Sequence, residues 1–342
     1  MSHPLEPRLA AYIAGRMPDA RDVAVSALER ISGGASRETY RFVLAWTEGG
    51  AARERRLILR RDPPASLIDT ERRVEFEAYR AFAGSAVPVP EMLWLEEDSG
   101  PLDHPFFVAE EISGFEASPQ ALLSGAHEAV LPTIAERKWT ILGEIAKADP
   151  EGVGLTRWME APALDRCWKR ELDNWEALID RDQAEPLPIT RAAIRWLRAN
   201  PPPPAQKLSV VHGDFRTGNF LWDAAGGIHG VLDWEMSHLG DPLEDLGWSL
   251  QPVWSFGREG RAGGLCAPAD AIAAWERASG LTADPAALHW WILFNCVKGQ
   301  GIWVGSAAAF NRGGNKAPIM VYPAWWLINA QDRAMLKVMG RL

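Results

Sequence analysis

The stretch with the clearest chemical potential is "HGDFRTGN", residues 212–219, which lies between the apolar runs "LSVV" and "FLW". It contains His212, Asp214 and Asn219, and the following segment "GGIHGVLDWE" carries Asp233 near its end. Core packing requires none of these polar groups. Two carboxylates and an amide oxygen are hard ligands of the kind that Mg²⁺ prefers while it keeps waters and substrate phosphates in its shell.

This set of side chains matches the requirements of phosphoryl transfer. In that reaction one carboxylate accepts the proton of the attacking hydroxyl, and other ligands hold the metal ions that neutralise charge on the moving group. The spacing predicts Asp214 as the base, with Asn219 and Asp233 as metal ligands. Because Asp and Asn are common turn formers, any one of them alone would suit an ordinary loop. We expect adjacent strands to bring all three to one end of a small sheet.

Composition limits the class of protein to which the chain belongs. Its 342 residues, 47% hydrophobic and 24% charged, suit a folded soluble protein of one large domain or two lobes. The N-terminus lacks a signal-peptide pattern, and no apolar run reaches the roughly 18 residues of a membrane helix, so we expect a cytoplasmic protein without membrane contact. A net charge of -9 argues against a nucleic-acid partner.

The three cysteines, Cys167, Cys266 and Cys296, are odd in number and far apart. This spacing favours reduced, partly buried thiols over disulfides or a zinc site. Most of the 17 tryptophans are expected in the core, because Trp is large and is usually buried.

The elements that must position the polar residues divide into two groups. A helical pattern in residues 5–17 precedes strand-like runs in residues 23–31, 38–46, 55–61, 87–98 and 104–112, with one helix at 69–82. After Gly114 the patterns are mainly helical, at residues 131–148, 163–180 and 190–200, up to the prolines of 201–204. We therefore place a lobe boundary at Gly114.

The motifs "HGDFRTGN", "VLDWE" and "GDPLEDLGW", in this order, resemble the aminoglycoside phosphotransferase family. The likeness is strongest to its branch related to the kinase domains of acyl-CoA dehydrogenase-fused proteins. It implies an α+β, two-lobed protein-kinase-like fold, with a small antiparallel-sheet lobe in residues 1–113 and a larger, mostly helical lobe in residues 114–342.

The family's catalytic loop reads His-x-Asp followed by Asn. The resemblance therefore implies a structural role for His212 beside the catalytic Asp214, and metal binding by Asn219 and Asp233. It also implies ATP or GTP as the phosphoryl donor, Mg²⁺ as the cofactor and a small molecule with a hydroxyl group as the partner. The oligomeric state is left open.

The nucleotide is expected at two backbone sites in the small lobe. The turn "ISGGASRETY" stands where kinases carry a Gly-rich loop, and Gly33, Gly34 and Ser36 would let the backbone approach the phosphates. This turn does not spell G-x-G-x-x-G, and an ordinary hairpin turn is the alternative. The segment "FFVAEEISG" resembles the hinge between kinase lobes, so backbone groups near Glu110 and Ile112 are expected at the adenine edge.

The lysine that protein kinases use to hold phosphates is missing, since the chain has no lysine before Lys138. Arg60 or Arg61, in the strand "RRLILRR", can replace it, because arginine keeps its charge and binds two oxygens. The resemblance favours Arg60. Glu75 is its expected partner on the following helix, with Glu77 as the alternative, and a surface ion pair is the simpler interpretation of either.

Two acidic residues of "GDPLEDLGW" have structural interpretations. Asp241 before Pro242 and Glu244 predicts a capped helix start. Asp245 either supports the catalytic loop or is a solvated helix carboxylate.

The acceptor's charge is inferred from residues 285–331, which contain no Asp or Glu. The segment has three cations, Lys298, Arg312 and Lys316, and five tryptophans, Trp290, Trp291, Trp303, Trp325 and Trp326. A polycationic aminoglycoside needs carboxylates, so these residues favour a neutral or anionic acceptor with an apolar body, such as a hydroxyacyl compound or its coenzyme A thioester. Helix packing and solvation account for most of them in the simpler interpretation.

Three alternatives stand beside this prediction. An antibiotic phosphotransferase would share the fold and mechanism. A metal-dependent hydrolase built on His212, Asp214 and Asp233 would leave the Gly-rich turn and the hinge unexplained. A catalytically silent nucleotide-binding module is favoured by the missing lysine, but the complete set of Asp214, Asn219 and Asp233 argues against it.

Overall fold

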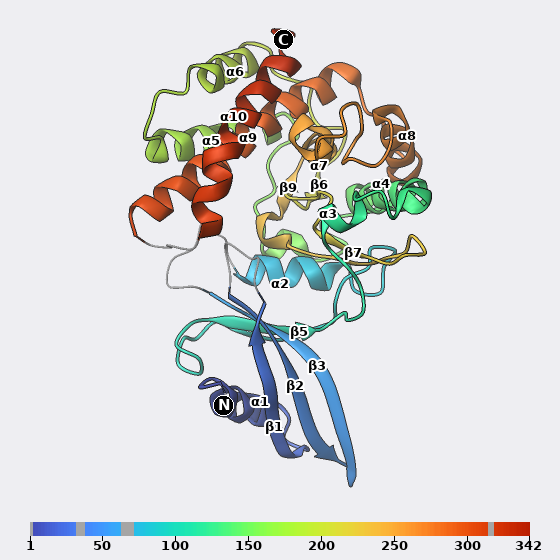
Figure 1. Cartoon of the computed structure of the whole chain (residues 1–342), viewed down its shortest axis with the longest axis vertical. Coiled ribbons are helices and arrows are strands. Elements are labelled where there is room, and N and C mark those ends of the chain that lie inside the picture. Colours follow the sequence, from blue (N-terminus) through green and yellow to red (C-terminus); the bar gives the residue numbers. More distant parts are fainter. Residues whose placement is uncertain (1–2, 32–37, 63–71, 314–317) are drawn as a thin grey trace.

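The computed structural model describes residues 3–31, 38–62, 72–313 and 318–342. A curved sheet with one helix beside it occupies one end of the molecule, and a larger group of helices occupies the other (Figure 1). The predicted two-lobed α+β fold is confirmed. The sheet's strands end at Glu110 and the next helix begins at Pro119, so the predicted boundary at 113/114 lies in the connecting segment and stays a prediction.

The smaller lobe is built on a five-stranded antiparallel sheet in the order β1-β2-β3-β5-β4. Its strands are β1 (Arg21–Arg30), β2 (Glu38–Glu48), β3 (Ala51–Arg61), β4 (Met92–Glu96) and β5 (Phe106–Glu110). Gly49 and Gly50 turn the β2–β3 hairpin with φ of 57° and 79°, the geometry of a two-residue turn. Helix α1 (Glu6–Arg16) packs its buried Leu9 and Ile13 into the same core as the strands.

Helix α2 (Arg72–Ala81) connects the two lobes and lies between them in Figure 1. Its Tyr79 ring lies 6.5 Å from the Phe107 ring of the sheet and 6.1 Å from the Trp234 ring of the larger lobe. The same helix buries Glu75 completely. A buried carboxylate requires a cationic or hydrogen-bonding partner, which makes this helix part of the site described below.

The larger lobe is helical. Its helices are α3 (Pro119–Leu122), α4 (Leu131–Lys147), α5 (Cys167–Asp182), α6 (Pro188–Ala199), α7 (Leu243–Leu250), α8 (Pro268–Ser279), α9 (Pro285–Asn311) and α10 (Pro318–Val338). Helix α9 buries residues around its whole circumference, as expected of a central core helix. Six tryptophans are fully buried, which fits the expected core role: Trp139, Trp234, Trp248, Trp275, Trp290 and Trp291.

The short strands around the predicted catalytic loop form two small sheets, and the prediction of one sheet is wrong. Strand β6 (Ser209–Val211) pairs with β9 (His238–Gly240), and β7 (Phe220–Trp222) pairs with β8 (Ile228–Val231). The strand that follows β8 returns to β6 because the chain reverses through the turn at 234–236. The polar residues therefore meet at loops between two sheets.

The cysteines form no disulfide, and Cys167 and Cys296 are buried. Among the described helices, none combines the length and apolar character needed to cross a bilayer.

Candidate active site

His212 holds the start of the catalytic loop. Its Nδ1 accepts the Asp214 backbone N–H at 3.2 Å, so its Nε2 carries the proton and donates to the Leu232 carbonyl at 3.0 Å. Burial lowers the pKa of His212 to about 4, which keeps the ring neutral. Both ring nitrogens are thus engaged with backbone groups. This geometry agrees with a supporting role and leaves no nitrogen for proton transfer.

Asp214 lies beside a large cavity with its carboxylate held at both oxygens. Asn219 Nδ2 donates to Oδ2 at 2.7 Å, and Trp248 Nε1 donates to Oδ1 at 2.9 Å. The Arg216 guanidinium lies 3.3 Å from the same Oδ1. Burial raises the pKa of Asp214, and Arg216 opposes that rise. Two neutral donors and one cation therefore orient a carboxylate that borders open space.

The two predicted metal ligands offer oxygen donors next to Asp214. The amide nitrogen of Asn219 donates to both the backbone carbonyl of Asp214, at 2.9 Å, and the Asp214 carboxylate. The amide oxygen of Asn219 therefore remains an acceptor. Asp233 has a left-handed φ of 70°, which Asp tolerates better than most residues, and its N–H donates to Tyr79 Oη at 2.8 Å. One amide and one carboxylate oxygen fit Mg²⁺ shared with phosphate oxygens.

Arg60 joins the small lobe to this loop. Its Nη1 lies 2.7 Å from Glu75 Oε1, and its Nη2 lies 3.0 Å from Asp233 Oδ1. Burial opposes ionisation of both Arg60 and Asp233. The Arg60 guanidinium nevertheless lowers the pKa of Asp233, and Glu75, followed by Asp233, raises the pKa of Arg60. Arg61 instead donates to Glu38 at 2.5 Å. The structure thus brings Arg60, of the two arginines, to Glu75.

The alternative helix partner, Glu77, pairs with Arg80 at 3.2 Å on the outer side of α2. At the hinge, Glu110 donates its N–H to the Glu91 carbonyl at 2.8 Å, so this donor is used inside the sheet. Within the described part of the chain, the backbone N–H and C=O of Ile112 have no hydrogen-bond partner. Gly33, Gly34 and Ser36 lie outside the described residues.

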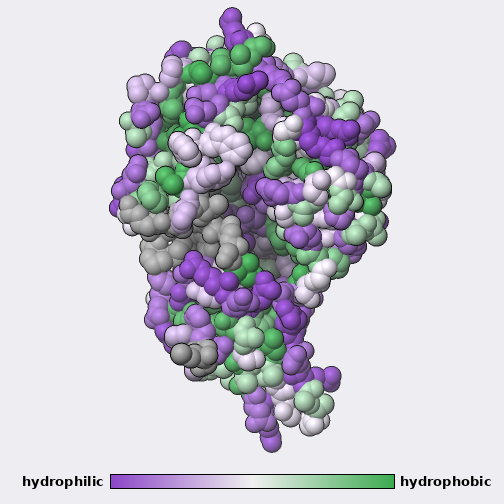
Figure 2. Space-filling view, in the orientation of Figure 1, coloured by the Kyte–Doolittle hydropathy of each residue, from purple (hydrophilic) through white to green (hydrophobic). Residues whose placement is uncertain are grey.

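A cavity of about 1230 Å³ extends from the catalytic loop across the larger lobe. Figure 2 shows a hollow at the level where the two lobes meet. Six aromatic residues line the cavity: Trp248, Trp254, Phe256, Trp303, Tyr322 and Trp326. Its charged residues comprise five cations (Arg60, Arg216, Arg261, Arg333 and Lys337) and four carboxylates (Asp214, Asp233, Glu235 and Glu259). The cavity is therefore mixed in charge, with aromatic side chains forming part of its wall.

The cations of the 285–331 segment do not supply this lining. Lys298 is buried and lies 3.0 Å from Glu244, and Arg312 lies 2.9 Å from Asp182. Lys316 lies outside the described residues. Taking these cations as groups that face the acceptor is wrong for Lys298 and Arg312, because each is already paired with a carboxylate on a neighbouring helix.

Helix α7 supports the catalytic loop through residues that sequence reasoning left open or missed. Asp245 accepts the N–H groups of His212 at 2.6 Å and Gly213 at 2.9 Å, which resolves its role in favour of loop support. Trp248, three residues further along the same helix face, reaches Asp214. This spacing of three residues after Asp245 was the available signal for Trp248.

The start of α7 differs in part from the prediction. Asp241 Oδ1 accepts the Leu243 N–H at 2.9 Å, and the helix begins at Leu243, one residue after Pro242. Glu244 makes no capping contact. Its carboxylate is completely buried and pairs with the nearby His238 and with Lys298. No local sequence pattern shows a partner as distant in the chain as Lys298.

Comparisons with known proteins agree with this geometry. The sequence model of the phosphotransferase enzyme family matches residues 27–291. The mouse acyl-CoA dehydrogenase family member 10 is 29% identical over 228 residues, which cover 63% of this chain and 19% of that protein. Its human relative, family member 11, is 24% identical over 278 residues, covering 76% of this chain and 34% of that protein. The chain thus spans a fifth to a third of these relatives.

Solved structures show the same fold. A presumed aminoglycoside phosphotransferase from Ralstonia eutropha superposes with a TM-score of 0.71 at 20% identity, covering 98% of both chains. A thermostable mutant of aminoglycoside phosphotransferase APH(4)-Ia, in a ternary complex with AMP-PNP and hygromycin B, has a TM-score of 0.57 at 20% identity, covering 95% of this chain and 98% of that one. The match over 27–291, together with this fold, shows that the chain belongs to the phosphotransferase enzyme family.

Proposed function

We propose that this chain is an ATP-dependent small-molecule kinase that transfers the γ-phosphoryl group to a substrate hydroxyl. The observation that carries the proposal is the Asp214 carboxylate, oriented by Asn219 and Trp248 at the edge of the cavity. Arg60 and its partner Asp233 line the same cavity, and Arg60 is also paired with Glu75. A positioned base and a phosphate-binding cation next to one cavity are the main parts that phosphoryl transfer requires.

The nucleotide occupies the junction of the lobes in this proposal. Ile112 offers its unpaired backbone N–H and C=O to the edge of the base, and ATP and GTP both present complementary groups there. Arg60, held by Glu75, would contact the phosphates, and Gly33, Gly34 and Ser36 are the further residues proposed to bind them. Mg²⁺, bound by Asn219 and Asp233 with phosphate oxygens, would neutralise charge on the transferred group.

The chain's own residues then organise the transfer. Asp214 accepts the proton of the acceptor hydroxyl while that oxygen forms its bond to the γ-phosphorus and the bond to the leaving diphosphate breaks. Arg216, whose guanidinium lies 5.0 Å from the centre of the Trp254 ring, is held between Asp214 and the aromatic wall of the cavity. His212 keeps the loop in place without taking up the proton.

The acceptor is proposed to be neutral or anionic with an apolar body, such as a hydroxyacyl compound or its coenzyme A thioester. The aromatic wall favours an apolar body, and five cations against four carboxylates favour an acceptor without positive charge. The likeness to acyl-CoA dehydrogenase family members 10 and 11 points to acyl compounds.

An antibiotic acceptor is the second candidate. One observation favours it: viomycin phosphotransferase from Streptomyces vinaceus is 29% identical over 150 residues, 42% of this chain and 48% of that protein. Glu235 and Glu259 in the cavity could pair with cationic groups of such a compound.

The decisive experiment follows label from γ-labelled ATP into two acceptor pools, one of hydroxyacids with their coenzyme A thioesters and one of aminoglycosides with viomycin. Asp214→Asn keeps the side chain's size but cannot act as a base, so kcat should fall by about 10²-fold or more. Asp223→Asn is the matched control, because Asp223 lies on a surface turn where it pairs with His229 and does not line the cavity.

Label in the hydroxyacyl pool that disappears with Asp214→Asn and persists with Asp223→Asn would support both parts of the proposal. Label only in the antibiotic pool would overturn the acceptor class and keep the mechanism. ATP bound without transfer to any acceptor would favour a catalytically silent module.

A further inference from the structure

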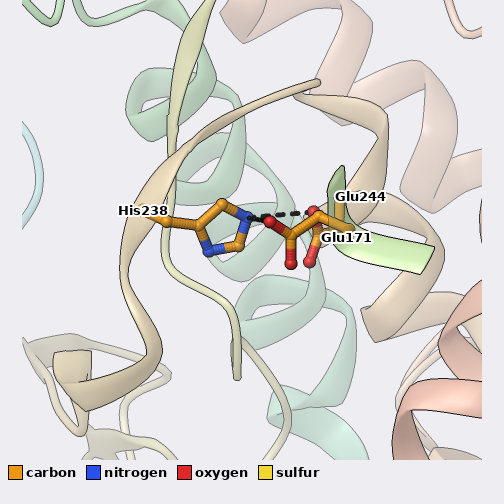
Figure 3. Close-up of side chains that lie close together, drawn as sticks. All are labelled: Glu171, His238 and Glu244. Carbon is orange, nitrogen blue, oxygen red and sulfur yellow. Dashed lines mark hydrogen bonds and ion pairs between the residues drawn. The ribbon is translucent and has the colours of Figure 1, made fainter. Parts of the chain in front are cut away.

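A largely buried group of four charged side chains reaches the catalytic loop through Lys298. We call it the loop-support network, and it consists of Glu171 of α5, His238 of β9, Glu244 of α7 and Lys298 of α9. Figure 3 shows His238 pointing toward both glutamates, which reach it from different helices. The phosphoryl-transfer chemistry proposed above assigns no role to these residues.

Lys298 connects this network to the peptide group that precedes Asp214. Its Nζ donates to the Gly213 carbonyl at 2.7 Å, and the other end of the same peptide, the Asp214 N–H, donates to His212 Nδ1 at 3.2 Å. Asp245 holds the preceding Gly213 N–H at 2.9 Å. Gly213 has a left-handed φ of 85°, and a Cβ there would lie 2.4 Å from the Met236 carbonyl oxygen. The peptide plane that sets the direction of the Asp214 side chain is therefore fixed at both ends.

His238 carries a proton on each ring nitrogen. Its Nδ1 lies 3.0 Å from the Met236 carbonyl and its Nε2 lies 3.0 Å from Glu244 Oε2, so both nitrogens face acceptors. A neutral imidazole has only one N–H and would leave two lone pairs opposed. Burial opposes the charge, but Glu171 and Glu244 outweigh it and raise the pKa of His238 to about 9. The neutral His212, which directly follows strand β6, shows the opposite arrangement.

The charges of the network balance one another through Glu244. Its Oε2 faces His238 and its Oε1 lies 3.0 Å from Lys298 Nζ. The side chains of Glu244 and Lys298 are almost fully buried. Burial disfavours the ionised form, but the two cations lower the pKa of Glu244 to about 2. The other charged groups facing the network are Arg170, 3.0 Å from Glu171, Asp241 just before α7, and Asp245 of α7. Lys298 is thus held in place by the Gly213 carbonyl and Glu244.

We propose that Lys298 is a positioning residue for phosphoryl transfer. Its ammonium fixes the Gly213 carbonyl and so directs Asp214 toward the cavity, while Glu244 and protonated His238 fix the ammonium. The inference rests on the proposed kinase function for its catalytic readout, but the geometry of the loop can be measured without any acceptor.

A purely structural role must be separated from this one, since removal of Lys298 leaves Glu244 buried without its ammonium partner. The test compares Lys298→Met with the double variant Lys298→Met/Glu244→Gln, in which that unpaired charge is gone. The double variant should recover the stability lost in the single variant. Lys207→Met is the matched control, because Lys207 also donates to a backbone carbonyl, that of Lys147 at 2.8 Å, but at the end of α4.

We expect the double variant to keep a kcat on the order of 10²-fold below wild type, with KM for ATP and acceptor changed little, because a misplaced base costs rate rather than ground-state binding. Glu244→Gln alone should lose less, since Lys298 keeps its bond to Gly213. Recovery of wild-type kcat in the folded double variant would overturn the proposal.

Hydrogen exchange of the backbone amides of 212–216 provides the readout that is independent of acceptor. Faster exchange at Asp214 in the double variant than in Lys207→Met supports the positioning role even if no acceptor is phosphorylated, an outcome that would count only against the proposed function. Unchanged exchange would overturn the proposal.

The ligand atoms of Glu171, His238 and Glu244 also lie within 4.8 Å of one another. The purified protein could be analysed for stoichiometric zinc or manganese. If such a metal were present and were lost with His238→Gln, a metal ion rather than a proton would occupy His238 Nε2. That result would overturn the charge balance described above.

Discussion

Two buried lysines approach the catalytic loop from different helices, and their surroundings differ. Lys298 of α9 donates to Gly213 and pairs with Glu244. Lys138 of α4 is equally buried, but its Nζ has no hydrogen-bond partner among the described residues. Instead it lies 3.6 Å from the centre of the Trp139 ring and 5.5 Å from that of Phe215, a residue of the loop itself.

The difference shows that burial alone does not determine what a charged residue contributes. Burial lowers the pKa of Lys138 to about 7, because two aromatic faces compensate only in part for the lost hydration. Lys298 has a carboxylate and a carbonyl as partners, so its ammonium is integrated into the loop. We infer that the first lysine reduces stability, whereas the second is required for the geometry of the site.

The same substitution at the two positions should change stability in opposite directions. Lys298→Met removes one partner of a buried ion pair, and we expect the free energy of unfolding to fall by about 3 kcal/mol. Urea denaturation followed by tryptophan fluorescence measures this change. A loss below that of an exposed pair such as Arg277–Glu136, which lies 2.9 Å apart on the surface, would mean that Lys298 and Glu244 do not depend on each other.

Lys138→Met should stabilise the protein by about 2 kcal/mol near neutral pH, since it replaces a buried amine without a hydrogen-bond partner by an apolar side chain of similar length. The pKa of Lys138 is lower in the folded state, about 7, than its ordinary value of 10.5. The folded state therefore disfavours the ammonium, and this penalty is complete below about pH 7 and vanishes above about pH 10.5.

The stabilising effect of Lys138→Met is accordingly expected to shrink from pH 7 to pH 10, as measured by urea unfolding at each pH. A gain that does not depend on pH would show that the pKa of Lys138 is the same in the folded and unfolded states, so that burial does not penalise its ammonium. A loss of stability would remove the contrast with Lys298.

Sequence reasoning predicted the parts of the site that depend on local spacing. The order of Asp214, Asn219 and Asp233 in one segment identified the loop, and alternation in residues 55–61 placed the arginines on a strand. The two-lobed fold was implied by the resemblance to the aminoglycoside phosphotransferase family, and the change of pattern near Gly114 supplied only the predicted lobe boundary. Residue roles in catalysis and metal binding stay predictions until activity is measured.

Sequence reasoning could not predict contacts between residues distant in the chain. Lys298 and Gly213 are 85 positions apart, so the same lysine was equally compatible with a solvated or substrate-facing position. Strand β9 pairs with β6, although β7 and β8 lie between them in the chain. The turn at 234–236 that brings β9 back to β6 carries no strong turn signal, so the prediction of one small sheet failed. Such pairings depend on how α7 and α9 pack, which periodicity does not show.

The smallest expected effect concerns His238, which shares the partner Glu244 with Lys298. The folded-state pKa of about 9 exceeds the ordinary 6.5, so the stability that the charged ring contributes is fully present below about pH 6.5 and is lost as pH rises through about 9. His238→Gln should therefore cost about 1 kcal/mol at pH 6 and much less at pH 9.5, measured by urea unfolding. In a Glu244→Gln background this pH dependence should be reduced, because one of the two carboxylates that raise the pKa is absent. If the cost of His238→Gln were the same at both pH values, His238 would be neutral, and Lys298 alone would balance the charge of Glu244.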